Sequence, residues 1–225
     1  SSNEATSMID STSVLFGLED EFVVTGLERL RRDDLRVVIE HREREAPCPT
    51  CGVLTSRVKD RPLVRVKDLD ACGQVVELWW RKRRLACPEP LCGTGSFTQR
   101  SEAIPTRARL TNRLRTMLAT EIASGNRAVD EVARCHGVSW PTAHRALVAA
   151  ATQWLPEPEP TRVLGIDETR ARSVRWVLAD AGWRRTDPWL TSFVDADTTS
   201  PGQILGLAPG RSGACVRDWL AEQRP

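Results

Sequence analysis

The first hundred residues alternate between apolar and polar positions at the period of a β-strand. Residues 35–40, 63–69 and 74–81 place apolar side chains at about every second position, and residues 22–24 form a shorter apolar run. Successive side chains of a strand point to opposite faces, so this period predicts strands with one buried face. Residues 70–73 separate the last two runs and end in a glycine, which predicts a β-hairpin over 63–81.

Beyond Pro105 the apolar positions recur at steps of three and four residues. This period predicts a helix over about 106–124, carried by apolar positions that include Leu114, Leu118 and Ile122. A second helix is expected over 129–135, and a turn at 136–138 follows it. A third helix is expected from Ser139, which suits the N-cap position, to about residue 155.

Three prolines within residues 156–160 end the helical pattern and predict a stiff, extended linker. Beyond it, residues 161–166 form an apolar strand pattern that ends on Asp167 and Glu168. Further strands are expected at 174–178, 189–194 and 203–207, and a last helix at 212–222. The expected fold class is multidomain α+β, with a disordered polar tail (1–13), a β domain (14–100), a helical domain (101–155), the linker (156–160) and an α/β segment (161–225).

Four of the seven cysteines form two closely spaced pairs, Cys48 with Cys51 and Cys87 with Cys92. Each spacing lets two thiolates reach one ion, and four thiolates complete a tetrahedral zinc shell. Two disulfides are the alternative, but the odd number of cysteines and the lack of a secretion signal in residues 1–30 disfavour them. We therefore predict a structural Zn²⁺ in a zinc-ribbon-like β domain. The other cysteines, Cys72, Cys135 and Cys215, are expected to be ordinary buried thiols.

The formal net charge of +2 conceals a basic middle of the chain. Residues 57–150 carry 17 Lys and Arg against 9 Asp and Glu, and the rest of the chain is acidic. This excess suits a phosphate-binding surface, although a solvated face that binds nothing would have the same composition. No apolar run approaches the ~18 residues that a membrane span needs. We expect a soluble, cytoplasmic protein with no membrane partner.

Residues 129–147 have the spacing of a DNA-binding helix-turn-helix. Ala133 lies where the two helices approach, Gly137 opens the turn, Val138 fills the space beneath it and Ser139 begins the next helix. Short helical hairpins also occur in proteins that never touch DNA, but nearby arginines favour DNA binding. A second candidate is the run 79–84, two tryptophans followed by four cations, which could instead pack on the β domain. The candidate DNA-contacting residues are Arg81, Lys82, Arg83, Arg84, Arg113, Arg127, Ser139, Trp140, Thr142, His144 and Arg145.

Asp167 is a candidate metal-binding carboxylate. RNase H-like nucleases place their first such carboxylate at the end of an apolar strand, and two Mg²⁺ ions are then held by carboxylates from several elements. One Asp-Glu pair at a strand end is also ordinary turn chemistry. Asp195 and Asp197 follow another expected strand and allow the same two interpretations.

The order of these motifs resembles the ISL3 family of bacterial insertion-sequence transposases. The matching residues begin at His41 and the first cysteine pair and continue through 80–84, the second pair and Phe97. They then include the helix-turn-helix of residues 129–147, called the bihelix below, and end at 163–169. The resemblance implies that a zinc module and a helix-turn-helix bind the terminal inverted repeats of the element, in double-stranded DNA at the nucleoid. It also implies an RNase H-like core of the DDE type that cuts and joins DNA with Mg²⁺, with Asp167 as the first catalytic carboxylate.

One departure from the family bears on catalysis. The family places its second Asp and its Glu beyond the positions that residues 161–225 can supply, so the RNase H-like segment is expected to be incomplete and this chain alone inactive. The expected function is then DNA binding, as a homodimer or beside an intact transposase. The alternatives are a transcriptional regulator or transposition inhibitor derived from a transposase, a zinc module that binds protein, and a self-contained nuclease.

Overall fold

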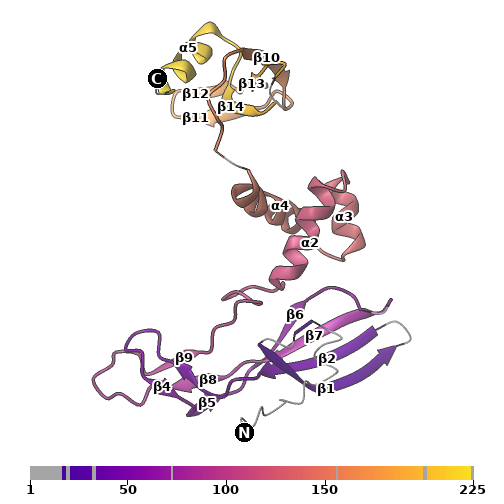
Figure 1. The fold of residues 1–225 in the computed structure, drawn as a ribbon, viewed down its shortest axis with the longest axis vertical. Helices are drawn as coiled ribbons and strands as arrows, with labels where there is room; N and C mark the ends of the chain where they lie inside the picture. Colours follow the sequence, from indigo (N-terminus) through magenta and orange to yellow (C-terminus); the bar gives the residue numbers. More distant parts are fainter. Residues whose placement is uncertain are drawn as a thin grey trace. The chain divides into compact units, whose positions relative to one another are not determined.

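The computed structural model describes residues 17–18, 21–31, 34–71, 73–155, 157–199 and 202–223. The chain divides into two compact units, Ser1–Trp154 and Leu155–Pro225 (Figure 1). The expected tail 1–13 and Cys72 lie outside the described residues.

A four-stranded sheet forms the first part of the N-terminal unit, in the order β1-β2-β7-β6 (Figure 1). Its strands are β1 (Phe22–Arg31), β2 (Asp34–His41), β6 (Leu63–Lys67) and β7 (Val75–Arg81). The predicted hairpin is confirmed, because β6 pairs antiparallel with β7. Strand β7 also pairs with β2, and this pairing is parallel, which no local pattern in the sequence indicates.

Alternate side chains of this sheet form one apolar core. Phe22, Ile39, Leu78 and Trp80 are buried in it. Ile104, which follows both cysteine pairs in the sequence, is buried in the same cluster. Trp79 faces the opposite way, where the Arg36 guanidinium lies 5.6 Å from its ring centroid. The two adjacent tryptophans therefore have different roles, as strand alternation requires.

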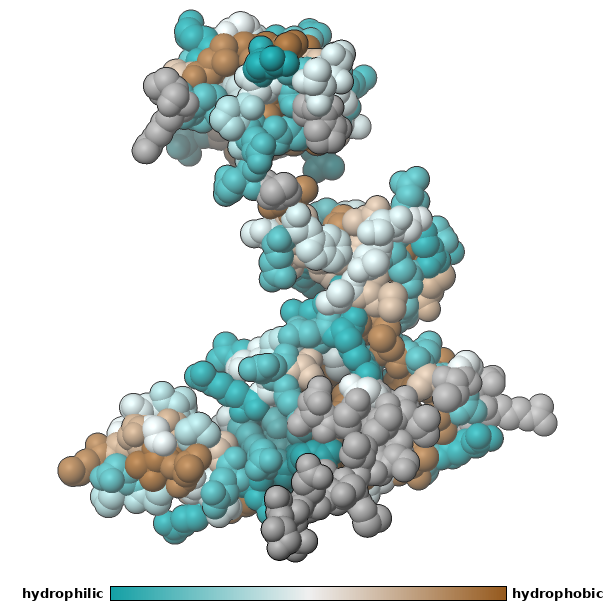
Figure 2. All heavy atoms as spheres, in the orientation of Figure 1, coloured by the Kyte–Doolittle hydropathy of each residue, from teal (hydrophilic) through white to brown (hydrophobic). Residues whose placement is uncertain are grey.

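Two small sheets form the ribbon. They are the hairpin of β3 (Ala46–Pro47) with β4 (Leu54–Thr55), and β5 (Val58–Asp60), β8 (Arg84–Ala86) and β9 (Ser96–Thr98) in the order β5-β8-β9. The buried ribbon core holds only Ala46, Cys48, Leu85 and Phe97. Leu54 and Leu91 are exposed, and Figure 2 shows hydrophobic side chains gathered at this lobe. So little apolar burial does not stabilise a small module without another cross-link.

Among the described residues, the N-terminal unit also contains the helices α2 (Asn112–Ala123), α3 (Val129–Cys135) and α4 (Trp140–Trp154). The expected positions of α3 and α4 are confirmed, but the start at residue 106 is wrong. Helix α2 begins six residues later because Thr111 caps it and Leu110 instead forms a bridge with Lys67 of β6. In the described part of the chain no helix is long and apolar enough to cross a membrane.

The C-terminal unit contains an antiparallel sheet in the order β10-β13-β14, followed by a helix. These elements are β10 (Leu164–Arg170), β13 (Trp189–Asp195), β14 (Ile204–Pro209) and α5 (Gly213–Glu222). A separate hairpin joins β11 (Trp176–Ala179) to β12 (Gly182–Arg185), and β12 was not anticipated. The expectation that the first strand ends at Asp167 is wrong, since β10 continues to Arg170 and Asp167 lies in its middle.

His41 is a buried imidazole at the end of β2. It stacks on Phe22, with ring centroids 4.9 Å apart, and meets Trp80 edge-on at 5.4 Å. Burial lowers the pKa of His41 from 6.5 to about 4, outweighing the opposite effect of Glu21. Because the unfolded chain takes up this proton near pH 6.5 and the folded chain only near pH 4, stability falls as the pH falls between these values.

Replacing His41 with phenylalanine should remove this pH dependence while keeping the aromatic packing. We expect the wild type to lose about 3 kcal/mol more unfolding free energy than His41→Phe between pH 6.5 and 4. Urea unfolding of both proteins across this range measures the difference, in which acid effects common to both cancel. If the unfolding free energies of the two proteins fell equally with falling pH, the neutral, buried state of His41 would be contradicted.

Candidate metal centre and nucleic-acid interface

The four paired cysteines converge in the ribbon. The sulfurs of Cys48, Cys51, Cys87 and Cys92 all lie within 4.8 Å of one another. Cys48 Sγ is 3.9 Å from Cys92 Sγ, and Cys51 Sγ is 3.6 Å from Cys87 Sγ. Each close contact therefore joins one pair to the other pair.

Tight turns in the backbone direct these sulfurs inward. Gly52 N–H donates to Cys48 O at 2.9 Å, and Gly52 has a positive φ of 74° that suits glycine. In the second turn Thr94 N–H donates to Cys92 Sγ at 3.4 Å. The Thr50 and Thr94 hydroxyls, 2.6 Å apart, link the two turns.

The donor set fits a zinc ion. Four sulfurs at Zn–S ≈ 2.3 Å in a tetrahedron are about 3.8 Å apart, which matches the observed separations and is far longer than a disulfide bond of about 2.05 Å. Amide N–H groups of Cys51 and Thr50 lower the pKa of Cys48 to about 7. The Glu89 amide lowers the pKa of Cys87, but burial and the neighbouring thiols raise it to about 12. Crowded thiols resist joint ionisation, and a bound cation would remove this obstacle.

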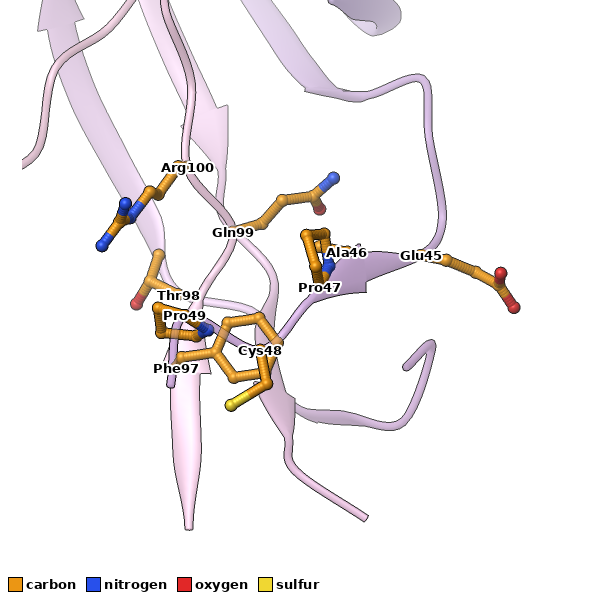
Figure 3. Close-up of a pocket in the computed structure, with 9 residues that line it drawn as sticks. All are labelled: Glu45, Ala46, Pro47, Cys48, Pro49, Phe97, Thr98, Gln99 and Arg100. Carbon is orange, nitrogen blue, oxygen red and sulfur yellow. The ribbon is translucent and has the colours of Figure 1, made fainter. Parts of the chain in front are cut away.

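A shallow cavity of about 300 Å³ lies beside Cys48, between residues 45–49 and 97–100 (Figure 3). Figure 3 shows Glu45 and Arg100 pointing away from its centre on opposite sides. Gln99, which lines the cavity, is buried, and its Nε2 donates to Glu43 O at 3.1 Å. This hydrogen bond holds the Gln99 side chain in place. Cys48 is the one thiol of this lining, and its sulfur belongs to the four-sulfur cluster.

The basic run before the second cysteine pair divides into internal and external side chains. Arg83 is buried and donates to Glu43 O at 2.6 Å and to His41 O at 3.0 Å, so it fastens the ribbon to the end of β2. Arg81 pairs with Glu40 at 3.1 Å, and Lys82 Nζ lies 4.5 Å from the Trp80 ring centroid. Arg84 is exposed, and its guanidinium donates to Ser96 Oγ at 3.1 Å.

Ion pairs bind α3 and the residues on either side of it to α2. Arg127 binds Glu121 of α2 and, at 2.8 Å, Glu131 of α3, and His136 Nε2 lies 2.9 Å from Glu121. Ala133 is buried at the helix contact, Gly137 has a φ of 59°, and Val138 packs on the helical core. This geometry agrees with the expected helix-turn-helix and leaves Arg127 engaged within the protein.

The first turns of α4 face outward with a varied set of side chains. Trp140 stacks on His144, with centroids 4.8 Å apart and planes 11° apart. Ser139 Oγ and Thr142 Oγ1 are 2.8 Å apart. Arg145 is exposed and forms no ion pair with any described residue. These are the positions from which a recognition helix reaches base edges.

A buried carboxylate joins the sheet to the helices. Asp68 follows β6, is 1% exposed and accepts from Thr111 Oγ1 at 2.6 Å and Arg113 Nε at 2.9 Å, with Arg113 Nη2 on its other oxygen. Thr111 Oγ1 also accepts from Leu114 N–H at 3.3 Å as the cap of α2. Arg113, one of the candidate DNA-contacting residues, thus binds Asp68 within the unit.

Comparison with protein-family models matches both modules. Residues 44–92 match the zinc-finger of transposase IS204/IS1001/IS1096/IS1165, and residues 99–151 match the helix-turn-helix domain of transposase family ISL3. The chain carries the N-terminal region of an ISL3-family transposase. No curated protein and no solved structure matches the chain significantly. Residues 44–151 therefore carry the zinc-ribbon and helix-turn-helix domains of a DNA-binding transposase, and the four sulfurs of the ribbon fit structural Zn²⁺.

The candidate catalytic carboxylate of this transposase chain is isolated. Asp167 is exposed on β10 opposite Ser192, and among the described residues it belongs to no group of three metal-ligating side chains. Asp195 accepts from the Thr161 hydroxyl, and Asp197 pairs with Arg162 at 2.8 Å. Both aspartates therefore bind the segment just before β10 to the end of β13 and the residues after it.

The Asp68 joint, by which we mean the binding of Asp68 to Thr111 and Arg113, was not anticipated from the sequence. The internal role of Arg83 was also missed. A polar residue directly after a strand and a Thr three residues before an apolar helical position were the available signals for the joint. Cys135, expected to be buried, is exposed and accepts from Arg127 Nη2 at 3.2 Å. Cys135 is the last residue of α3, and its sulfur lies where the Arg127 guanidinium contacts that helix.

Removing one sulfur ligand should remove the metal from this transposase chain. We expect one Zn²⁺ per chain in the wild type and loss of stoichiometric zinc in Cys51→Ser, because three ligands bind far more weakly than four. Native mass spectrometry measures the metal content, and Co²⁺ substitution reports tetrahedral thiolate coordination by its absorption. The matched control Cys215→Ser should keep its zinc. Full zinc in Cys51→Ser would contradict the assigned site.

Proposed function

We propose that the N-terminal unit recognises the terminal inverted repeats of an insertion sequence in double-stranded DNA. The observation that carries the proposal is the N-terminal part of α4, whose first two turns carry the exposed Arg145, Thr142 and the Trp140–His144 stack. The helix-turn-helix match at residues 99–151 supports the same orientation.

Helix α4 would enter the major groove with its first two turns against the base edges. An arginine there can donate two hydrogen bonds to guanine, whereas Thr142 can bond to any base or contact a thymine methyl group. Trp140 and His144 are already stacked, so their flat surface needs little ordering when DNA binds. Ser139 lies at the start of the helix, close to where a phosphate would pass.

The ribbon would supply a second contact, to the phosphate backbone. Arg84 is exposed, and Arg81 and Lys82 lie on the same stretch of chain. Arg83, Arg113 and Arg127 would instead act indirectly, because their guanidiniums hold the ribbon, α2 and α3 in place. This division assigns specificity to α4 and much of the salt-dependent affinity to the ribbon.

The proposal assigns DNA binding, and not strand transfer, to the described residues. A two-metal site needs several converging carboxylates, and Asp167 has no such neighbours among them. Asp167 would act only within a site that further carboxylates complete, and Mg²⁺ would belong to that site. A homodimer or a complex with intact transposase would be the natural partner state.

Arg145→Ala and Arg84→Ala should weaken DNA binding in different ways. We expect Arg145→Ala to lose about tenfold or more in discrimination between the terminal repeat and unrelated duplex. Arg84→Ala should weaken all duplexes alike and reduce the salt slope by about 1. Fluorescence anisotropy at several salt concentrations measures both effects.

The matched control is Arg217→Ala, an exposed arginine of α5, which should bind as the wild type does. If the wild type bound no duplex even at low salt, the proposal would fail. If its preferred site were a promoter palindrome rather than a terminal repeat, the protein would be a regulator.

A further inference from the structure

The β11–β12 hairpin of the C-terminal unit presents an unusual face. Trp176 lies opposite Arg185, and Leu178 lies opposite Trp183. Cross-strand partners and residues two apart share a face, so all four side chains lie on the same side. Trp176 is 61% exposed, Leu178 71% and Trp183 68%. Two broad indole rings are thus held in solvent by a two-stranded sheet that pairs with no other described strand.

A polar pocket of about 280 Å³ continues this face. Arg185 at the end of β12 lines it together with Trp189 and Arg211, and the Arg211 guanidinium lies 4.7 Å from the Trp189 ring centroid. Neither Arg185 nor Arg211 forms an ion pair with any described residue.

The pocket also contains one acid, Asp187. Its Oδ1 accepts from Trp189 N–H at 3.0 Å, and Arg172 Nε donates to its main-chain oxygen at 3.1 Å. The guanidiniums of Arg185 and Arg211 thus line the pocket with one carboxylate, and the Arg172 guanidinium binds the main chain of the same aspartate. The surroundings of the pocket remain positively charged.

We propose that this hairpin face and its pocket bind unpaired nucleotides. Exposed indoles stack on bases of any sequence, and arginines beside them bind the connecting phosphates. Trp176 and Trp183 would each stack on a base, while Arg185 and Arg211 would hold a phosphate in the pocket. The inference rests on the proposed function in one respect: it adds a single-strand site to a chain that binds duplex elsewhere.

Charge favours this occupant over an apolar protein surface. Arg185 lies on the tryptophan face and Arg211 lies in the adjoining pocket. Arg175 precedes β11, Arg184 lies on the other face of the hairpin, and Asp180 is the acid at its turn. A protein partner matched to the tryptophans alone would have to cover these cations without neutralising them, at a desolvation cost. A polyanion that also carries flat apolar rings satisfies both features at once.

The test uses the whole chain and two labelled probes, a single-stranded oligothymidine of about fifteen nucleotides and a blunt duplex. The double variant Trp176→Ala/Trp183→Ala should bind oligothymidine about tenfold or more weakly and the duplex within about twofold of the wild type. Arg185→Ala/Arg211→Ala should reduce the salt slope for oligothymidine by about 1.4. Trp176→Phe/Trp183→Phe should retain most of the affinity, and Arg217→Ala is the matched charge control.

The outcomes separate this inference from the duplex proposal. Arg145→Ala should show the reverse pattern, with weaker duplex binding and unchanged oligothymidine binding. Oligothymidine binding that is undetectable, or equal in the wild type and the tryptophan double variant, overturns the inference whatever happens to the duplex. The inference is also overturned if the tryptophan double variant sediments differently from the wild type but binds oligothymidine equally well. That result would make the face a self-association surface.

Discussion

The buried Asp68 carboxylate is the interaction on which the arrangement of the N-terminal unit depends. It binds the Thr111 hydroxyl and the Arg113 guanidinium, and it lies beside the N-terminus of α2, where a negative charge is favourable. Leaving one charge of such a pair buried without its partner costs about 3–5 kcal/mol. Lys67 N–H also donates to Arg109 O, and Leu69 packs on the helical core. The sheet and the bihelix are therefore held in one orientation.

Besides the Asp68 joint, two further interactions fix the structure of the N-terminal unit. Four thiols gather where the ribbon has too few apolar side chains to stabilise itself, and Arg83 fastens the ribbon to β2 through two main-chain oxygens. Three of the arginines expected to touch DNA are engaged in such internal contacts. In this unit, basic side chains with several acceptors preserve the geometry, while those with few, such as Arg84 and Arg145, remain available to a ligand.

The features that local chemistry determines could be predicted from the sequence. The cysteine spacing, the β6–β7 hairpin and the helices α3 and α4 depend on residues within a few positions of one another. The parallel β2–β7 pairing, the Asp68 joint and the burial of Arg83 depend on residues about forty positions apart, and no local pattern encodes them. The β12 strand was overlooked because its tryptophan and arginines remain exposed and give no buried period, although Gly182 marked the turn. Asp167 lies within its strand because Thr169 and Arg170 continue the pairing with β13.

A fixed orientation of ribbon and bihelix has a direct consequence for DNA. The two surfaces should contact the duplex at a constant spacing, which makes the pair more selective than either alone. Hydroxyl-radical footprinting of wild type and Asp68→Asn on the terminal repeat tests this most directly. The account predicts two protected stretches in the wild type, and in Asp68→Asn continued protection at the α4 stretch with loss at the ribbon stretch. Identical footprints for the two proteins would contradict it.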